Sequence, residues 1–235
     1  MLQILEKVVD QYKSYLKTHF FFRDKDLRES FEKELDNWNL MRGPFIEGMP
    51  VYRRALTLEK LLSDIGDSDI SGSKAFVDAL FGTRPLYAHQ EKAVRHAMQG
   101  RNFLLSAGTG GGKTECFLFP IMIDLLKEFR AGTLGPGVRA LILYPMNALA
   151  NDQRARIGEY MRRLSELGSD FAFTFGRYTG ETPEDEKDRY RNASRAAEER
   201  LPGELVFRSE MRQNPPNILL TNYSMLEYLL LRPDD

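Results

Sequence analysis

Residues 106–115 constrain this chain more than any other stretch, because they combine four glycines with a lysine and a hydroxyl residue. The stretch follows a short apolar run, 103–105, and opens a segment with helical periodicity. Glycines can adopt positive φ and turn their backbone N–H groups inward, where these groups and a helix N-terminus hold an anion. A strand, a glycine loop and a helix in this order are the context of a phosphate-binding loop. The sequence therefore predicts a phosphate site between residues 106 and 115.

The residue types within this loop suggest what it binds. Lys113 is expected to reach the β and γ phosphates of a nucleotide, and the Thr114 hydroxyl is expected to ligate Mg²⁺. The strict pattern asks for glycine where this chain has Ala107, which is one departure. A glycine-rich turn without a ligand is the alternative interpretation. The nucleotide-binding candidates are Ala107, Gly108, Thr109, Gly110, Gly111, Gly112, Lys113 and Thr114, with Lys113 and Thr114 as the catalytic candidates.

Composition leaves the choice of partner open. A chain of 235 residues with 42% hydrophobic and 29% charged residues can bury one substantial core or two small ones. The net charge of −1 does not decide about nucleic acid, since a large motor can be neutral overall and basic only along a groove. The single cysteine, Cys116, excludes an intrachain disulfide, and no His/Cys cluster has zinc-ligand spacing. Without a signal peptide or a run of about 18 apolar residues, a cytoplasmic protein is expected.

Helical periodicity dominates residues 1–82. The expected elements are helices over 2–16, 26–35, 58–65 and 74–81, the second capped by Asp26, with a loop over 41–50 and a polar linker over 67–73. Together they predict a small helical accessory region over residues 1–82. Core packing is the favoured interpretation of its apolar stripes, and a membrane-surface or partner-binding face is the alternative.

From residue 83 the pattern changes to alternating strands and helices. Strands are expected over 103–106, 138–144, 171–175 and 217–221; helices are expected before residue 100, over 113–130, 147–164 and 182–200, and from 224 onward. Strands that alternate with helices form right-handed parallel βαβ units, which bind ligands at the carboxyl ends of the strands. Residues 83–235 are therefore predicted to be an α/β domain with a parallel sheet.

Three strings agree in order with one family: GTGGGKTECFLFP, LILYPMNALANDQ and NPPNILLTNYSMLEYLLLRP. Through them, residues 84–233 resemble the first RecA-like motor domain of a superfamily 2 DEAD/DEAH-box helicase. The resemblance is greatest to the large bacterial helicases of DNA repair and phage defence. It implies an incomplete RecA-like P-loop domain that binds ATP and Mg²⁺, preceded by the helical region. DNA is favoured over RNA by the resemblance alone.

Carried over residue by residue, the resemblance implies further contacts. Gln90 is similar to the glutamine that hydrogen-bonds to the adenine edge, although a capping or solvent-facing amide is an equally good interpretation. The family accepts alanine at the position of Ala107. Contacts to nucleic acid are implied for Pro145, Met146, Asn147, Thr179, Gly180, Thr221 and Asn222, the first three through backbone amides and a helix N-terminus. Helix caps or turns are the alternative for these positions.

No segment of the sequence resembles motif II, the acidic box that holds Mg²⁺ and orients the attacking water. The motif III strand and the second RecA-like domain with its arginine fingers are not found either. Because phosphoryl transfer depends on positioned charge around the γ-phosphate, this chain is expected to bind ATP but hardly to hydrolyse it alone. We interpret it as the ATP-binding part of a longer helicase, or as a chain whose partner supplies motif II and the second domain. The alternatives are a non-hydrolysing ATP- or DNA-binding fragment with a regulatory or assembly role, and another P-loop NTPase.

Overall fold

The computed structural model describes residues 2–39, 48, 51–66, 73–191 and 200–232. The chain forms two compact units, Met1–Val51 and Tyr52–Asp235. The loop expected over 41–50 and the linker expected over 67–73 lie mostly outside the described residues, as do residues 192–199 of the helix expected over 182–200.

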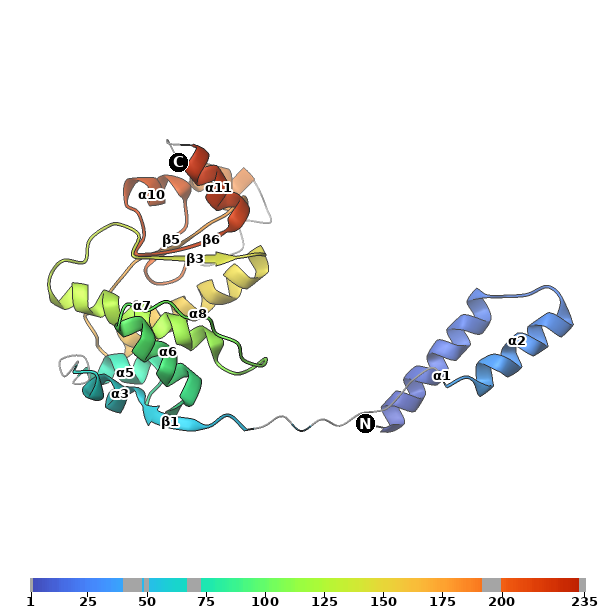
Figure 1. Cartoon of the computed structure of the whole chain (residues 1–235). Helices are drawn as coiled ribbons and strands as arrows, with labels where there is room; N and C mark the ends of the chain where they lie inside the picture. The colour runs from blue at the N-terminus through green and yellow to red at the C-terminus, as the bar shows by residue number, and fades with distance from the viewer. Residues whose placement is uncertain (1, 40–47, 49–50, 67–72, 192–199, 233–235) are drawn as a thin grey trace. The chain divides into compact units, whose positions relative to one another are not determined.

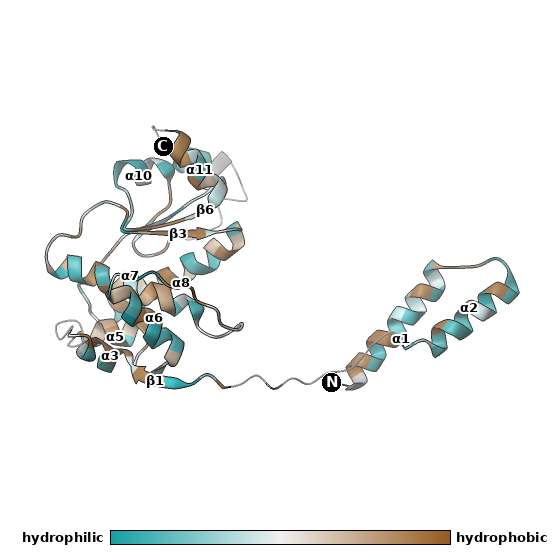
Figure 2. Ribbon diagram, viewed as in Figure 1, coloured by the Kyte–Doolittle hydropathy of each residue, from teal (hydrophilic) through white to brown (hydrophobic). Residues whose placement is uncertain are grey.

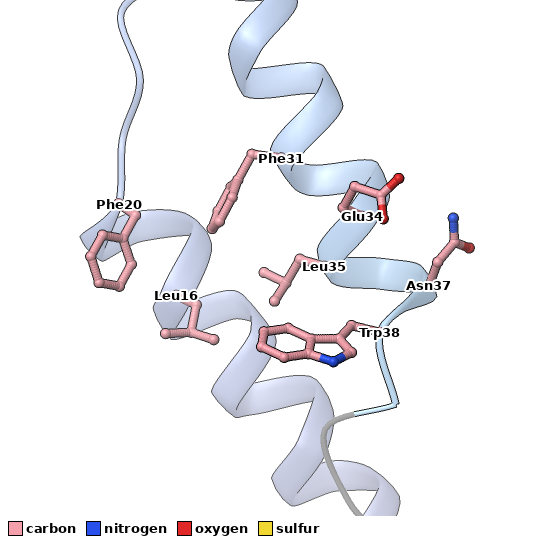
Figure 3. A pocket seen from close by; sticks show the side chains of 7 residues that line it. All are labelled: Leu16, Phe20, Phe31, Glu34, Leu35, Asn37 and Trp38. Atoms are coloured by element: carbon pink, nitrogen blue, oxygen red, sulfur yellow. The ribbon is translucent and has the colours of Figure 1, made fainter.

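The first unit is a hairpin of two helices, α1 (Leu2–His19) and α2 (Lys25–Asn37). Asp24, and not the expected Asp26, caps α2, because its side chain accepts from the Leu27 amide at 2.9 Å. Lys17 bridges the helices through an ion pair with Asp36 at 2.9 Å. The helices border an apolar pocket of about 510 Å³, lined by Leu16, Phe20, Phe31, Glu34, Leu35, Asn37 and Trp38 (Figure 3).

The apolar stripe of α1 is only partly packed within this unit. Val8, Tyr12 and Tyr15 are each more than half exposed, whereas Leu5, Val9 and Leu16 are half-buried, so the hairpin packs only part of the stripe. Leu35 of α2 is the one buried side chain among the unit's described hydrophobic residues, at 3% exposure.

The second unit begins with a strand that the sequence did not suggest. β1 (Arg54–Thr57) pairs antiparallel with β2 (Pro85–Tyr87), across the boundary expected at residue 82/83. Thr57 then caps α3 (Leu58–Asp64) as expected, and α5 (Lys74–Leu80) follows. As compact units the chain divides between Val51 and Tyr52: β1 pairs with β2, and α3 and α5 share the core of the second unit. The boundary expected at 82/83 stays a prediction.

A parallel sheet supports the second unit. Its described strands are β3 (Ala140–Tyr144), β4 (Phe175–Tyr178), β5 (Glu204–Leu205) and β6 (Ile218–Asn222), in the spatial order β3-β6-β4-β5. α8 (Asn147–Glu166) lies along one face, and α11 (Tyr223–Leu231) packs against β6 from the other (Figure 1). The predicted α/β class with a parallel sheet is confirmed.

The remaining helices complete this unit. They are α6 (Ala88–Met98), which packs against α7 (Lys113–Arg130), and the short α9 (Glu186–Arg191) and α10 (Arg208–Gln213). One core joins α3, α5, α7, α8 and the sheet; its fully buried members include Leu58, Leu61, Phe76, Leu118, Phe119, Ile157, Phe175 and Leu220.

None of the helices in the described parts of the chain is both long and apolar enough to cross a bilayer.

The sheet differs from expectation at two places. The strand expected over 103–106 is not formed: residues 101–108 have no regular structure, and Leu104 is 96% exposed. Apolar sequence alone does not make a strand, because a strand also needs a neighbour with which to pair. The strand expected over 171–175 is displaced to β4 (Phe175–Tyr178), since Phe171 and Phe173 are buried in the core without being part of the ladder.

β3 is an edge strand among the described strands. Figure 2 shows apolar residues along it, and Leu141 and Leu143 are 44% and 46% exposed. One face of β3 therefore presents leucines to the surface, while Ile142 on the opposite face is 8% exposed.

Candidate nucleotide and nucleic-acid site

The glycine loop follows a backbone path that requires glycine. Gly110 has φ of 77° and Gly112 has φ of 65°, both in the left-handed region that other residues rarely adopt. Gly112 is the residue directly before α7, so the loop turns sharply into the helix. A Cβ at Gly112 would lie 2.3 Å from Nε2 of Gln90, which leaves no room for a side chain.

Lys113 lies over the loop that precedes it. Its ammonium donates to the carbonyl oxygens of Ala107 at 2.8 Å and Gly108 at 3.2 Å, although it belongs to the first turn of α7. The positive charge, the N-terminus of α7 and the turned glycines thus converge on one small volume. Backbone N–H groups and a cation in this arrangement fit a phosphate.

The structure provides few protein ligands for the metal expected beside Thr114. Thr114 lies in the first turn of α7 and is half-buried. Across the described residues, no three His, Cys, Asp or Glu side chains gather where they could hold a metal ion. Mg²⁺ characteristically keeps several waters and binds through one or two protein groups plus phosphates, so a single hydroxyl fits only a metal that arrives with the nucleotide.

Two residues at the start of α6 hold the loop in place. Gln90 is 1% exposed; its Oε1 accepts from the Tyr87 amide at 2.8 Å, and its Nε2 donates to the Gly112 carbonyl at 3.0 Å. His89 donates from Nε2 to the Gly111 carbonyl, with 2.6 Å between the two atoms, a tautomer assigned from that geometry. The structure thus brings Gln90 to the loop, where both ends of its amide bond within the chain. Contact with adenine stays a prediction that depends on the second amide hydrogen.

Aromatic rings support His89 from the side. The rings of Tyr52, Tyr87 and His89 are mutually 5.2 to 5.6 Å apart between centroids, and a Cβ at Gly111 would lie 2.8 Å from the Tyr52 hydroxyl. Neither His89 nor Tyr52 was predicted as a site residue. His89 was adjacent to a recognised residue and could have been found, whereas Tyr52 gave no signal because it precedes β1 and reaches the loop only through the β1–β2 pairing.

A small pocket opens beside the loop. It has a volume of about 320 Å³ and is lined by parts of the loop and by Arg54, Phe81, Arg84, Tyr87, Gln90 and Glu115. The Arg84 guanidinium lies over the Phe81 ring, 4.4 Å from its centroid. Flat rings, a stacked guanidinium and a buried amide are suited to a planar, hydrogen-bonding group such as a nucleobase.

The predicted nucleic-acid residues meet at the carboxyl ends of three strands. Asn147 follows β3, Thr179 follows β4, and Asn222 ends β6. The Asn222 amide donates to Oδ1 of Asn147 at 2.9 Å, and the Asn147 amide donates to Glu181 at 3.1 Å. We call Pro145–Asn147, Gly180–Glu181 and Asn222 together the strand-end face.

The threonines at this edge face inward. Thr179 and Thr221 are both fully buried, and the Thr221 hydroxyl donates to the Tyr178 carbonyl at 2.6 Å. The Thr179 hydroxyl accepts from the Glu181 amide at 3.3 Å. Their side chains fit the cap-and-turn interpretation, and direct contact with a nucleic acid stays a prediction for both. Pro145, Met146 and Gly180 are exposed, so these predicted residues are accessible.

α8 offers its N-terminus at the strand-end face. The helix starts at Asn147, and its cap residue, Met146, provides no side-chain hydrogen bond to the first turn. Met146 itself is 59% exposed. Uncapped N–H groups at the end of a long helix suit a phosphate backbone, which supports the predicted contact through amides.

Known proteins resemble this chain over the same elements. Residues 87–198 match the family model described as DEAD/DEAH box helicase. The Druantia protein DruE of Escherichia coli (strain UMEA 4076-1) is 27% identical, over 97% of this chain and 17% of its own length. The ATP-dependent helicase Lhr-Core of Methanothermobacter thermautotrophicus is 28% identical, over 61% of this chain and 15% of its own length. The chain therefore spans less than a fifth of the length of these two relatives.

A solved structure has the same fold. The crystal structure of the DUF1998 helicase MrfA bound to DNA and AMPPNP covers 77% of this chain with a TM-score of 0.51 and 22% sequence identity, and the match covers 20% of that protein. Over residues 87–198 the chain is therefore similar to DEAD/DEAH box helicases, and the solved structure shows a similar fold.

Proposed function

We propose that this chain is the ATP-binding part of an ATP-dependent helicase or translocase that acts on nucleic acid, with DNA favoured over RNA. The observation that carries the proposal is the convergence of Lys113, the positive-φ glycines and the N-terminus of α7 on one volume. In this proposal the loop binds the phosphates of ATP, and Thr114 contributes its hydroxyl to the accompanying Mg²⁺. A DNA-repair or phage-defence role and a cytoplasmic location stay predictions.

We place the nucleic acid at the strand-end face. Asn147 and Asn222 present amides there, and the N-terminus of α8 adds backbone donors. Phosphate contacts of this kind position a strand without reading its sequence. MrfA, whose fold is similar, was crystallised with DNA and AMPPNP, which supports a site for each ligand on such a fold.

Hydrolysis is proposed to need groups that this sequence does not contain. An arginine finger alone is worth about 10³ to 10⁵ in the rate of phosphoryl transfer, and no acidic box resembling motif II is found in the 235 residues. We therefore propose that the rest of a longer helicase, or a partner chain, supplies the acidic box and the second motor domain. The second candidate function, a non-hydrolysing ATP-binding fragment, is favoured by the same absence.

Binding and turnover separate these candidates. We would measure binding of a fluorescent ATP analogue and the release of phosphate, with and without single-stranded DNA, for the chain and for Lys113→Ala. Nucleotide binding lost in Lys113→Ala, with no turnover in any sample, is the expected result. DNA-stimulated turnover by the chain would contradict the need for outside groups, and nucleotide affinity unchanged by Lys113→Ala would overturn the assignment of the loop.

A further inference from the structure

An ion pair joins the glycine loop to the helix that starts at the strand-end face. Glu115, two residues after Lys113 in α7, accepts a hydrogen bond from Nη1 of Arg156 at 2.5 Å. Arg156 belongs to α8, whose first residue is Asn147. The pair therefore connects, in one contact, the helix that begins at the loop and the helix that begins at the proposed nucleic-acid site.

Only one of the two carboxylate oxygens of Glu115 has a hydrogen-bond partner among the described residues. Its side chain is 12% exposed, and its second oxygen, Oε2, is buried without a hydrogen-bond partner among the described residues. That oxygen lies beside the loop, because a Cβ built on Gly112 would be 3.1 Å from it. A buried carboxylate with one unsatisfied oxygen is costly unless a positive charge compensates it, and Arg156 is the cation that bonds to it.

The charge of Glu115 matters for the loop because the proposed ligand is an anion. A carboxylate near the glycine loop opposes the binding of phosphate, whereas the same carboxylate neutralised by Arg156 does not. The influence of this charge on its neighbours is visible at Cys116 and Tyr160, where burial, and after it the Glu115 carboxylate, raises the pKa of each side chain.

Arg156 also has an electrostatic effect at the end of β3. Burial raises the pKa of Tyr144, the last residue of β3, and the positive charge of Arg156 opposes that rise. Pro145 and Met146 follow Tyr144 directly and belong to the strand-end face. With a side chain that is 42% exposed, Arg156 has room to change its position when α8 or this strand end moves.

Resting on the proposed function, we infer that Glu115 and Arg156 are positioning residues through which a nucleic acid on the strand-end face changes the affinity of the glycine loop for ATP. While Arg156 is paired with Glu115, the electrostatic potential at the loop stays positive. Displacement of Arg156 leaves an unpaired carboxylate beside the loop and lowers the affinity of the loop for phosphate. Because such coupling is reciprocal, ATP changes the affinity for nucleic acid by the same factor.

Charge-neutralising variants test this link by binding measurements alone. The affinity for a fluorescent ATP analogue would be measured with and without a saturating single-stranded oligonucleotide, for the chain, Arg156→Gln, Glu115→Gln and the double variant. Arg163→Gln is the matched control, because Arg163 lies on the same helix and pairs with Glu159 at 2.9 Å on the surface. Thermal unfolding of each variant checks that the fold is retained.

The link predicts a specific pattern. Arg156→Gln weakens nucleotide binding about tenfold, and the double variant restores it to within about threefold, because removing the carboxylate removes the need for the cation. In all three Glu115 and Arg156 variants, the oligonucleotide no longer changes nucleotide affinity. Arg163→Gln keeps both the affinity and the oligonucleotide effect.

Other outcomes overturn the inference in recognisable ways. A double variant as weak as Arg156→Gln would show a packing role and not charge compensation. An oligonucleotide effect that survives in Arg156→Gln, or that is absent from the unsubstituted chain while nucleotide still binds, would also overturn the link. Failure of the unsubstituted chain to bind nucleotide at all would overturn the proposed function, and the link with it, before any variant is considered.

Discussion

Asn147 and Asn222 are 75 residues apart in the sequence, and the side-chain amide of Asn222 donates to that of Asn147 at 2.9 Å. The contact exists because β3 and β6 are parallel neighbours in register, Tyr144 opposite Asn222, so that their carboxyl ends meet. Two motifs that the sequence presents separately are therefore parts of one surface.

Because this surface is the proposed nucleic-acid site, we predict that both amides contribute to binding single-stranded DNA. Asn147→Ala and Asn222→Ser are each expected to weaken binding about threefold to tenfold, the loss typical of one or two hydrogen bonds. Serine is chosen at 222 because Asn222 also caps α11 by accepting from the Met225 amide at 2.8 Å, and a serine oxygen can keep that cap. Fluorescence anisotropy with a labelled oligonucleotide measures the effect. Unchanged DNA affinity in both variants would remove the strand-end face from the binding site.

Glu181 places a negative charge on the same face. It accepts from the Asn147 amide at 3.1 Å and is exposed. Glu181→Gln keeps this hydrogen bond and removes repulsion of phosphate, so DNA binding is expected to tighten about twofold to fivefold at low salt, with a smaller gain at high salt. Glu166→Gln is the control, since Glu166 ends α8, about 28 Å along the helix from Asn147. Equal gains in both variants would indicate only a general charge effect.

The loop could be located from the sequence, and its supports could not. Glycines and Lys113 carry their chemistry in their spacing, which is local information. Tyr52 reaches Gly111 because β1 pairs with β2, and the sequence of residues 52–57 does not predict this pairing. Glu115 directly follows Thr114 in the sequence, but the role proposed for it depends on its ion pair with Arg156, which is 41 residues later.

The strand expectations show the same limit. Residues 217–221 were placed within one residue of β6, because an apolar run between polar ends suits a central parallel strand. Residues 103–106 have a similar apolar composition and remain outside the sheet. The difference between them is the presence of a pairing neighbour, which is a property of the tertiary structure.

Gly112 is expected to be intolerant of any side chain. Gly112→Ala forces a residue with a Cβ to φ of 65° and brings that atom within 2.3 Å of Gln90. The left-handed conformation alone costs about 1–2 kcal/mol, so unfolding midpoints should fall and nucleotide affinity should drop at least about tenfold as the loop shifts. Gly135→Ala is the control, because no atom lies within 4 Å of its Cβ position and its φ is not in the left-handed range. Equal behaviour of the two variants would contradict the described path of the loop.

Cys116 should make the chain less stable in alkali. The thiol is fully buried, and burial, followed by the neighbouring Glu115, raises its pKa to about 11. In the unfolded chain a thiol ionises near pH 8.5, so between that pH and about 11 the unfolded state loses a proton that the folded state keeps. The free energy of unfolding therefore falls as pH rises, by about 1.4 kcal/mol for each unit between the two pKa values.

Denaturant unfolding of the chain and of Cys116→Ala, from pH 8 to pH 11, isolates this contribution. The alanine variant is less stable at pH 8, because a small cavity replaces the sulfur, but the gap should close as pH rises. Tyr160, whose pKa is raised to about 12, acts mainly above pH 10 and is common to both proteins, so it cancels in the difference. A gap that stays constant across this range would mean that the thiol is not held neutral by its burial beside the loop.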